Sequence, residues 1–590
     1  MAATRNPLPR RRHAAGLAAL GLLLALAAAS CPLRAAAARV ALVPLSSDSH
    51  IAAFTALSTE LEKHGGHEIV MVVSNEMLDA ARAAADARSP GNRHAYITYP
   101  LRFDLFADDM ARIAKANFIL SMFYGYRILA AMMESVVGNA DLLSQITAAS
   151  PDLIVGDAVG AYGHSLSSRT GIPAVEFDVG TSSGMLHSGV YGGQLNPAYV
   201  PAPGTFYPST GMTLPQRCAN TASMVAAKVL NYAHSKWGPI AALARRHNLS
   251  RPGLGPSRPL LLLVNFDFAL EPARPVAPNT HYLGPLMPRP AAPLPEDLRA
   301  WLEGGGDGAA SEAASGAGAR GEKGRPAKPL PVVYVSFGAS FLAPDSVMRP
   351  LAAAISALAG RARFLVRARE QEAAALLAAL DASPGGRPAA AGLLVVPRVP
   401  QNDVLGHPSV AAFVTQGGYL SVQEAAYHGV PIVGVPLTLG QGELVQHAAD
   451  HGRGAVVRKE ALAAGDAAPL IAALEEVVVL RPEAYRRQAA ITAQRLRAHP
   501  RSPGQRAADL VGYALAMPRA GSFLHTQGQD MRWFQVILAD VLAAYAAAAI
   551  GGFFAARAAL RALRGRGGGA ARQGAAGSGG AERRKAGKRE

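Results

Sequence analysis

Short apolar runs alternate with longer mixed segments along most of this chain. Each run is bounded by turn-forming residues and has the length of a strand that is buried on both faces of a parallel sheet. The segments between the runs are typical of helices, and this alternation predicts an α/β protein with doubly wound parallel sheets. Strands are expected at Arg39–Leu45, Glu68–Val73, Pro151–Asp157, Gly171–Val175, Leu260–Val264, Val332–Phe337, Arg363–Arg367, Leu393–Val396, Val410–Thr415 and Pro431–Leu437.

A low-complexity segment divides the pattern into two halves. Residues 304–331 are rich in Gly, Ala and Ser and cannot bury enough apolar surface to order themselves. They are predicted to form a disordered linker between an N-terminal domain of residues 39–303 and a C-terminal domain of residues 332–520. A length of 590 residues suits two domains with additional segments.

Both ends of the chain carry segments typical of membrane targeting. Residues 1–38 have a basic start, a short apolar core and small residues for cleavage, which predicts a secretory signal peptide. An uncleaved anchor and an Arg-rich transit peptide are the alternatives. Residues 536–556 are apolar apart from Asp540 and are long enough to cross a bilayer. A buried helix of a soluble domain is the alternative, but Trp533 before the run and the basic cluster after it favour a span.

The charge distribution narrows the choice of partners. The net charge is +16, and residues 557–590 alone hold ten basic and two acidic residues, with almost no aromatic residues. A basic tail that follows an apolar helix argues against nucleic acid and predicts a cytosolic tail on a single-pass type I protein. The two cysteines, Cys31 and Cys218, exclude a disulfide framework and a Cys-rich zinc site. We expect Cys218 to be a buried, inert thiol.

One Gly-Gly turn combines with its neighbours into a candidate nucleotide site. The apolar run Val410–Thr415 ends at Gln416-Gly417-Gly418, and a helix is expected at Ser421–His428 before the strand Pro431–Leu437. Glycine lets a ligand approach the backbone closely, and a helix N-terminus offers free N–H groups to a diphosphate. The order strand, turn, helix and strand therefore predicts a βαβ unit that binds phosphate groups.

This stretch resembles the signature of the UDP-glycosyltransferases, the family that includes the UDP-glucuronosyltransferases. The resemblance implies a GT-B fold, in which two doubly wound Rossmann-like domains face each other, followed here by a C-terminal transmembrane helix. The matching residues are Pro400-Gln401-Asn402-Asp403, Leu405-Gly406-His407-Pro408, Thr415, Gly417-Gly418, Glu424-Ala425, His428-Gly429-Val430-Pro431, Gly434, Pro436 and Gln441.

The resemblance also implies a catalytic pair in the first domain. Ser49-His50 follows the first strand and is similar to the family's Ser-His pair, whose His is the catalytic base. Pro151–Asp157 is similar to the segment that carries the partner Asp, so Asp157 is predicted to hold His50 in the right tautomer. The implied reaction is an inverting transfer of a hexosyl or glucuronosyl group from a UDP-sugar to a hydroxyl of a small lipophilic acceptor.

The donor site is implied in the second domain. Gln401 would frame the uracil, Glu424 would accept hydrogen bonds from the ribose, and Gln441 would bind sugar hydroxyls. Gly417, Gly418 and Ser421 would hold the phosphates, and Ser340 lies in a turn similar to the family's first turn of this domain.

Several residues depart from the family pattern. Arg398 replaces a Trp and Gln416 a His, and both stay in our predicted donor set. Leu420, Gly440 and Leu444 replace Asn, Asp and Asn. Because each lost hydrogen bond weakens donor binding, two alternatives remain: a different sugar nucleotide, or a non-catalytic binding protein on a degenerate donor site.

The remaining expectations concern modification, metal and location. Asn248 begins a glycosylation sequon, which is meaningful if the body is lumenal. No DxD motif is present, so we expect no metal and no cofactor beyond the UDP-sugar as co-substrate. The family implies the endoplasmic reticulum with a lumenal catalytic body, and the sequence leaves open whether the chain forms a homo-oligomer.

Overall fold

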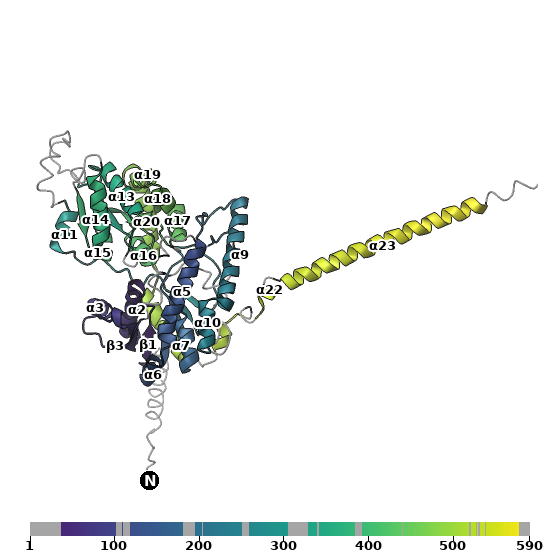
Figure 1. Cartoon of the computed structure of the whole chain (residues 1–590), viewed down its shortest axis with the longest axis horizontal. Helices are drawn as coiled ribbons and strands as arrows, with labels where there is room; N and C mark the ends of the chain where they lie inside the picture. The colour runs from purple at the N-terminus through teal and green to yellow at the C-terminus, as the bar shows by residue number, and fades with distance from the viewer. Residues whose placement is uncertain are drawn as a thin grey trace, which may run out of the picture. The chain divides into compact units, whose positions relative to one another are not determined.

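The structure is a computed structural model, and its elements are labelled in Figure 1. It divides into two compact units, residues 1–525 and 526–590. The structure describes residues 37–101, 109, 112, 118–180, 195–202, 204–249, 259–304, 329–338, 342–383, 392–438, 440–517, 521–526, 528, 531–536 and 538–577. Most of the predicted signal peptide and linker, the end of the tail, and Ser340 lie outside these residues.

The first sheet has seven parallel strands in the order β3-β2-β1-β4-β5-β6-β7. The order reverses between β1 and β4, and ligands of open α/β sheets bind at the carboxyl ends of strands beside such a reversal. The strands are β1 Arg39–Val43, β2 Glu68–Ser74, β3 Ala95–Tyr99, β4 Leu153–Asp157, β5 Ala174–Asp178, β6 Leu262–Val264 and β7 Thr280–Tyr282.

The second sheet has six parallel strands in the order β10-β9-β8-β11-β12-β13, and it reverses between β8 and β11. Two doubly wound parallel sheets in one chain confirm the predicted fold class. The strands are β8 Val332–Ser336, β9 Arg363–Arg367, β10 Leu393–Val396, β11 Val410–Thr415, β12 Ile432–Gly434 and β13 Gly454–Val456.

Helices connect the strands of both sheets, as right-handed parallel crossovers require. In the first half they are α2 Asp48–Glu60, α3 Leu78–Arg88, α5 Phe118–Val137, α6 Ala140–Ala148, α7 Tyr162–Thr170, α9 Leu214–Trp237 and α10 Pro239–Arg246, with a π-helical turn at Leu61–Gly65. The remaining ones in the first unit are α11 Glu296–Leu302, α13 Asp345–Ala357, α14 Glu370–Asp381, α15 Gln401–Leu405, α16 Tyr419–His428, α17 Gln441–Asp450, α18 Lys459–Ala463, α19 Ala468–Leu474, α20 Pro482–Arg497 and α21 Pro503–Ala516, with a π-helical segment at Glu475–Leu480.

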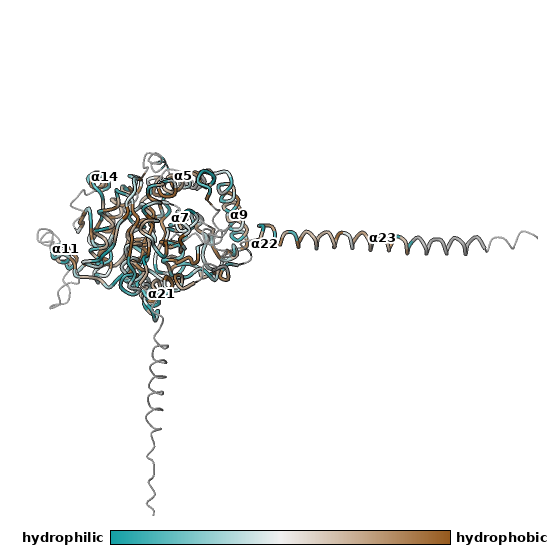
Figure 2. The backbone as a smooth tube through the Cα atoms, turned by 90° about the horizontal axis from the view of Figure 1, so that it is seen from below, coloured by the Kyte–Doolittle hydropathy of each residue, from teal (hydrophilic) through white to brown (hydrophobic). Residues whose placement is uncertain are grey.

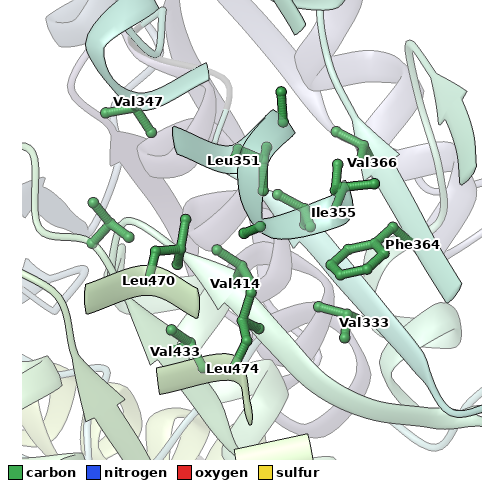
Figure 3. Packing of buried hydrophobic residues seen from close by; sticks show 14 of the residues in the cluster. Val333, Val347, Leu351, Ile355, Phe364, Val366, Val414, Val433, Leu470 and Leu474 are labelled. Carbon is green, nitrogen blue, oxygen red and sulfur yellow. The ribbon is translucent and has the colours of Figure 1, made fainter. Parts of the chain in front are cut away.

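Both faces of the second sheet are buried, which explains its nearly continuous apolar strands. Along β8, Val333 packs into the cluster on one face and Tyr334 into the cluster on the other. Figure 3 shows the first of these clusters, where Leu351 and Ile355 of α13 and Leu470 of α19 lie over the strands. Alternate residues of one strand therefore support two separate helical layers.

The last helix of this unit returns to the first sheet. Ser502 caps α21 by accepting from the backbone N–H of Gln505, and Pro503 occupies the first helical position. Ala507 and Val511 of α21 are fully buried in the core cluster of the first domain. Helix α21 therefore forms part of the core of the first domain.

The second unit contains α22, Trp533–Val536, and the long helix α23, Ala539–Gly577. Residues 539–564 of α23, whose hydropathy is coloured in Figure 2, are apolar and long enough to cross a membrane. The helix begins three residues later than predicted, because Leu538 takes a left-handed φ of +57°. Length and composition support a membrane anchor.

One expectation about the first domain is wrong. Cys218 lies on α9 and is an exposed free thiol rather than a buried one. Its neighbour in the helix, Asn220, is the buried residue, because that side of α9 faces the domain.

Candidate active site

The fold brings His50 and Asp157 together at the carboxyl edge of the first sheet. His50 lies in the first turn of α2, directly after β1, and Asp157 is the last residue of β4. Because β1 and β4 are adjacent strands at the reversal of strand order, the two side chains meet. The Nδ1 atom of His50 lies 2.5 Å from Oδ2 of Asp157.

Asp157 is held by the backbone as well as by His50. The backbone N–H of Leu45 donates to its Oδ2 over 3.1 Å, and the N–H of Val159 donates to its Oδ1 over 3.0 Å. The carboxyl group is fully buried, and His50 is 14% exposed. Three donors therefore fix the orientation of the carboxylate, and the carboxylate fixes the imidazole.

The environment sets the tautomer and the basicity of His50. Asp157 receives hydrogen bonds as a carboxylate, so the proton is assigned to Nδ1 and Nε2 is left as the proton acceptor. Burial lowers the pKa of His50, but the charge and hydrogen bond of Asp157, with the charge of Asp178, outweigh burial and raise the pKa above 6.5. A base poised near neutral pH is suited to proton abstraction.

Sequence reasoning missed Asp178. This residue is the last of β5, the strand next to β4, and its side chain is buried. Its carboxyl oxygen accepts from the backbone N–H of Gly180 over 3.0 Å. The available signal was an acidic residue at the end of an apolar strand, a position that Asp157 also occupies.

The predicted nucleoside-binding residues form one hydrogen-bonded group in the second domain. The Nε2 atom of Gln401 donates to Oε2 of Glu424 over 2.6 Å and to the hydroxyl of Ser421 over 3.1 Å. The hydroxyl of Tyr334, which the sequence did not indicate, donates to Oε1 of Gln401 over 3.2 Å. Burial raises the pKa of Glu424 to about 7, although the hydrogen bond from Gln401 acts in the opposite direction.

The Gly-Gly turn requires glycine at its first position. Gly417 has a φ of +88°, and a Cβ atom there would lie 2.5 Å from Cγ2 of Val445. Gly418 is the N-cap of α16. A Cβ atom at this position would meet no clash, because its nearest neighbour would be Nε2 of Gln416 at 3.7 Å. The buried Oε1 of Gln416 has no hydrogen-bond partner within the described part of the chain. The turn therefore presents an amide side chain and a helix N-terminus on one side.

The structure explains part of the departures near Gln441. Gly440 caps α17 with a φ of +82°, a conformation that favours glycine over the family's Asp. The Oε1 atom of Gln441 accepts from the backbone N–H groups of Leu437 and Thr438, which leaves its NH₂ group for a ligand.

Two other departures serve packing. Leu444 is buried in a core cluster to which both domains contribute residues. Leu420 packs against the core cluster of the first domain. Arg398 is exposed. Asn248 is exposed just after α10, and Ser250 of its sequon lies outside the described residues.

The start of α16 contacts the carboxyl edge of the first sheet. The Nε2 atom of Gln423 donates to the backbone carbonyl of Asn265, which follows β6, over 2.5 Å. The ring of Tyr419 packs edge-on against Phe266 with centroids 5.7 Å apart. The start of α16, which follows the Gly417-Gly418 turn, therefore packs against the same edge of the first sheet that carries His50 and Asp157. Across the described ranges, no group of three or more His, Cys, Asp or Glu residues has the arrangement of a metal site.

Solved structures with the GT-B fold match this chain. A UDP-glucose: anthocyanidin 3-O-glucosyltransferase in complex with UDP aligns with a TM-score of 0.52 and 18% identity, over 82% of this chain and 99% of that one. Os79 from O. sativa, in complex with U2F and trichothecene, aligns with a TM-score of 0.51 and 18% identity, over 81% of this chain and 100% of that one. At this identity the match establishes the fold.

Sequence comparison establishes the family. The profile described as "UDP-glucoronosyl and UDP-glucosyl transferase" matches residues 40–562, so the chain belongs to the UDP-glycosyltransferase family. The 2-hydroxyacylsphingosine 1-beta-galactosyltransferase of Rattus norvegicus is 26% identical over 429 residues, covering 68% of this chain and 67% of that protein. The UDP-glucuronosyltransferase 2B15 of the same species is 26% identical over 417 residues, covering 69% of each.

Proposed function

We propose that this UDP-glycosyltransferase moves a hexosyl or glucuronosyl group from a UDP-sugar to a hydroxyl of a small lipophilic acceptor, with inversion at the anomeric carbon. The observation that carries the mechanism is the 2.5 Å contact between Nδ1 of His50 and Oδ2 of Asp157. Nε2 of His50 takes the acceptor proton while the acceptor oxygen bonds to the anomeric carbon. The bond from that carbon to the phosphate oxygen breaks on the opposite face, and UDP leaves with the electron pair.

The second domain supplies the leaving-group site in this proposal. Gly417, Gly418 and the N-terminus of α16 receive the phosphates, because unpaired N–H groups and the helix dipole stabilise developing negative charge. Glu424 accepts from the ribose, and the free NH₂ group of Gln441 faces the sugar. The matched galactosyltransferase carries a hydroxylated lipid in its name, which supports testing lipid hydroxyls as acceptors.

We further propose a single-pass type I protein of the endoplasmic reticulum, with α23 as the anchor and the catalytic body in the lumen. The apolar span at residues 539–564 supports the anchor. A protease-protection assay on sealed microsomes tests the orientation. The body is expected to resist protease until detergent is added, and cleavage in intact vesicles would contradict the topology.

A UDP-release assay tests the activity. UDP-glucose, UDP-galactose and UDP-glucuronic acid are each supplied with phenol, sterol and hydroxylated-lipid acceptors. We expect acceptor-dependent release with at least one pair and its loss in His50→Ala.

Because Leu420 and Leu444 have become packing residues, a second candidate is a binding protein without transferase activity. UDP binding without release by either protein would favour that candidate.

A further inference from the structure

Helix α9 presents an apolar face to solvent. Its buried side carries Asn220, Met224 and Ala227, whereas large apolar residues on the other side are more than half exposed. Their spacings of 11, four and three residues are each close to a whole number of turns, which places them on one face of the helix. They are Leu214 at 65%, Val225 at 54%, Val229 at 61% and Tyr232 at 53% exposure.

Two other exposed apolar residues lie near the end of α9. Trp237, the last residue of α9, is 78% exposed. Phe123 of α5 is 42% exposed, and its ring lies 6.4 Å from that of His234. Figure 1 shows α9 as an outer helix of the first unit beside α5. We call the stripe on α9 the α9 face; it consists of Leu214, Val225, Val229 and Tyr232.

The charges around the α9 face are all of one sign along the helix. Residues 214–237 contain no Asp or Glu and carry Arg217, Lys228 and Lys236. Arg217 and Lys228 are exposed at the flank of the stripe, and Nζ of Lys236 lies 5.5 Å from the ring centroid of Tyr232. Basic residues beside exposed aliphatic and aromatic side chains are typical of a helix that lies on an anionic bilayer surface.

We propose that the α9 face docks on the surface of a bilayer that contains anionic lipid. The proposal adds a second contact to the membrane anchor proposed for α23 and rests on that anchoring for proximity to lipid. Tyr and Trp suit the interface because each has an apolar body and a polar tip. A second copy of this chain fits the α9 face less well, since two identical faces would bring like charges together.

The native thiol on α9 offers a direct test. Cys218 is exposed and precedes Val225 by two turns on the same side of the helix. The full chain with Cys31→Ser is labelled at Cys218 with bimane and reconstituted in phosphatidylcholine vesicles, with or without phosphatidylserine. Acyl chains brominated near the headgroup quench a label that enters the interface. The control label is placed at Leu480→Cys in a chain lacking both native thiols, because Leu480 is 67% exposed in the second domain.

We expect strong quenching at position 218 in anionic vesicles, weaker quenching in neutral vesicles and none at position 480. Replacing Arg217 and Lys228 by Gln should lower the ratio of docked to undocked protein by about fivefold for each charge. Val225→Ser with Val229→Ser should abolish quenching while circular dichroism and uridine binding are unchanged.

Equal quenching at both labels, or energy transfer between labelled chains in place of quenching, would overturn the proposal. Flotation with neutral vesicles reports α23 separately, so loss of anchoring is distinguishable from loss of docking.

Discussion

Replacing Asp157 by Asn tests the proposed base without changing the size of the side chain. The carboxylate accepts at Oδ1 from Val159 and at Oδ2 from Leu45 and His50. An Asn side chain keeps one acceptor oxygen, and its NH₂ group must face at least one backbone N–H. One buried donor loses its partner in either orientation, which should cost about 1–3 kcal/mol of folding stability.

The effect on the chemical step should be larger than the effect on stability. A positioned general base contributes about 10²–10⁴-fold to rate. At 1.36 kcal/mol for each factor of ten, this is about 3–5 kcal/mol of activation free energy. The Asn variant removes the negative charge that stabilises the imidazolium, and one of its two orientations selects the wrong tautomer. We therefore expect kcat to fall by about 10²–10⁴-fold with little change in UDP affinity.

The pH profile gives the sharper readout. His50 acts as a base only when neutral, so kcat/KM rises as the pH passes its pKa, which Asp157 and Asp178 hold above 6.5 against the effect of burial. Without the charge of Asp157, the effect of burial is less opposed, so the pKa of His50 falls. The acid limb should therefore move to lower pH. UDP release between about pH 5.5 and 8.5 measures this limb.

Asp152→Asn is the matched control. Asp152 lies at the start of the same strand, is exposed, and accepts from the backbone N–H of Arg39 over 2.8 Å. It should leave the acid limb in place. The assignment of His50 as the base is refuted if Asp157→Asn leaves both kcat and the acid limb unchanged in a protein that still binds UDP.

Three further predictions concern the donor site and the domain contacts. Burial raises the pKa of Glu424 to about 7. If Glu424 accepts from the ribose hydroxyls as proposed, uridine should bind more tightly as the pH rises through that value, and calorimetry should show that Glu424→Gln removes this dependence. Gly417→Ala should lower the free energy of unfolding by about 1–3 kcal/mol in denaturant titration, since it combines a positive φ with a clash at Val445. Arg289→Ala should cost about 1 kcal/mol near neutral pH, because Arg289 pairs with Asp403 through two hydrogen bonds but is half-exposed. Burial acts to raise the pKa of Asp403, but its hydrogen bonds and the charge of Arg289 outweigh burial and lower the pKa below 3.8. This difference in stability should therefore persist down to pH 3.8 and be lost only as the pH falls through the lowered pKa.

The second sheet was more predictable than the first, because buried strands produce unbroken apolar runs. Three of its strands, β9, β10 and β11, have the predicted bounds. The strand expected at Pro431–Leu437 is only Ile432–Gly434, since pairing with its neighbours ends there. Helix α13 runs through Pro350 from Asp345, because Pro350 removes only the bond to the carbonyl of Ser346 near the helix start.

Edge strands and contacts between distant elements were harder to predict. Strand β3 is half-exposed at the edge of its sheet and β7 has only three residues, so neither gives a clear apolar run. His50 and Asp157 could be predicted from a motif. The roles of Asp178, Tyr334 and Gln423 depend on which strands are neighbours and where side chains point, and no local pattern contains that information.

The return of α21 to the first sheet has a consequence for synthesis. Ala507 and Val511 complete the core beside Leu57 and Leu61, yet they are made long after the first domain's own strands. At about 5–20 residues per second, the ribosome needs roughly 10–40 s between residues 303 and 516. During that interval the nascent first domain exposes an apolar surface, so chaperones in its compartment have a defined surface to protect. A fragment that ends in the linker would keep that surface exposed permanently.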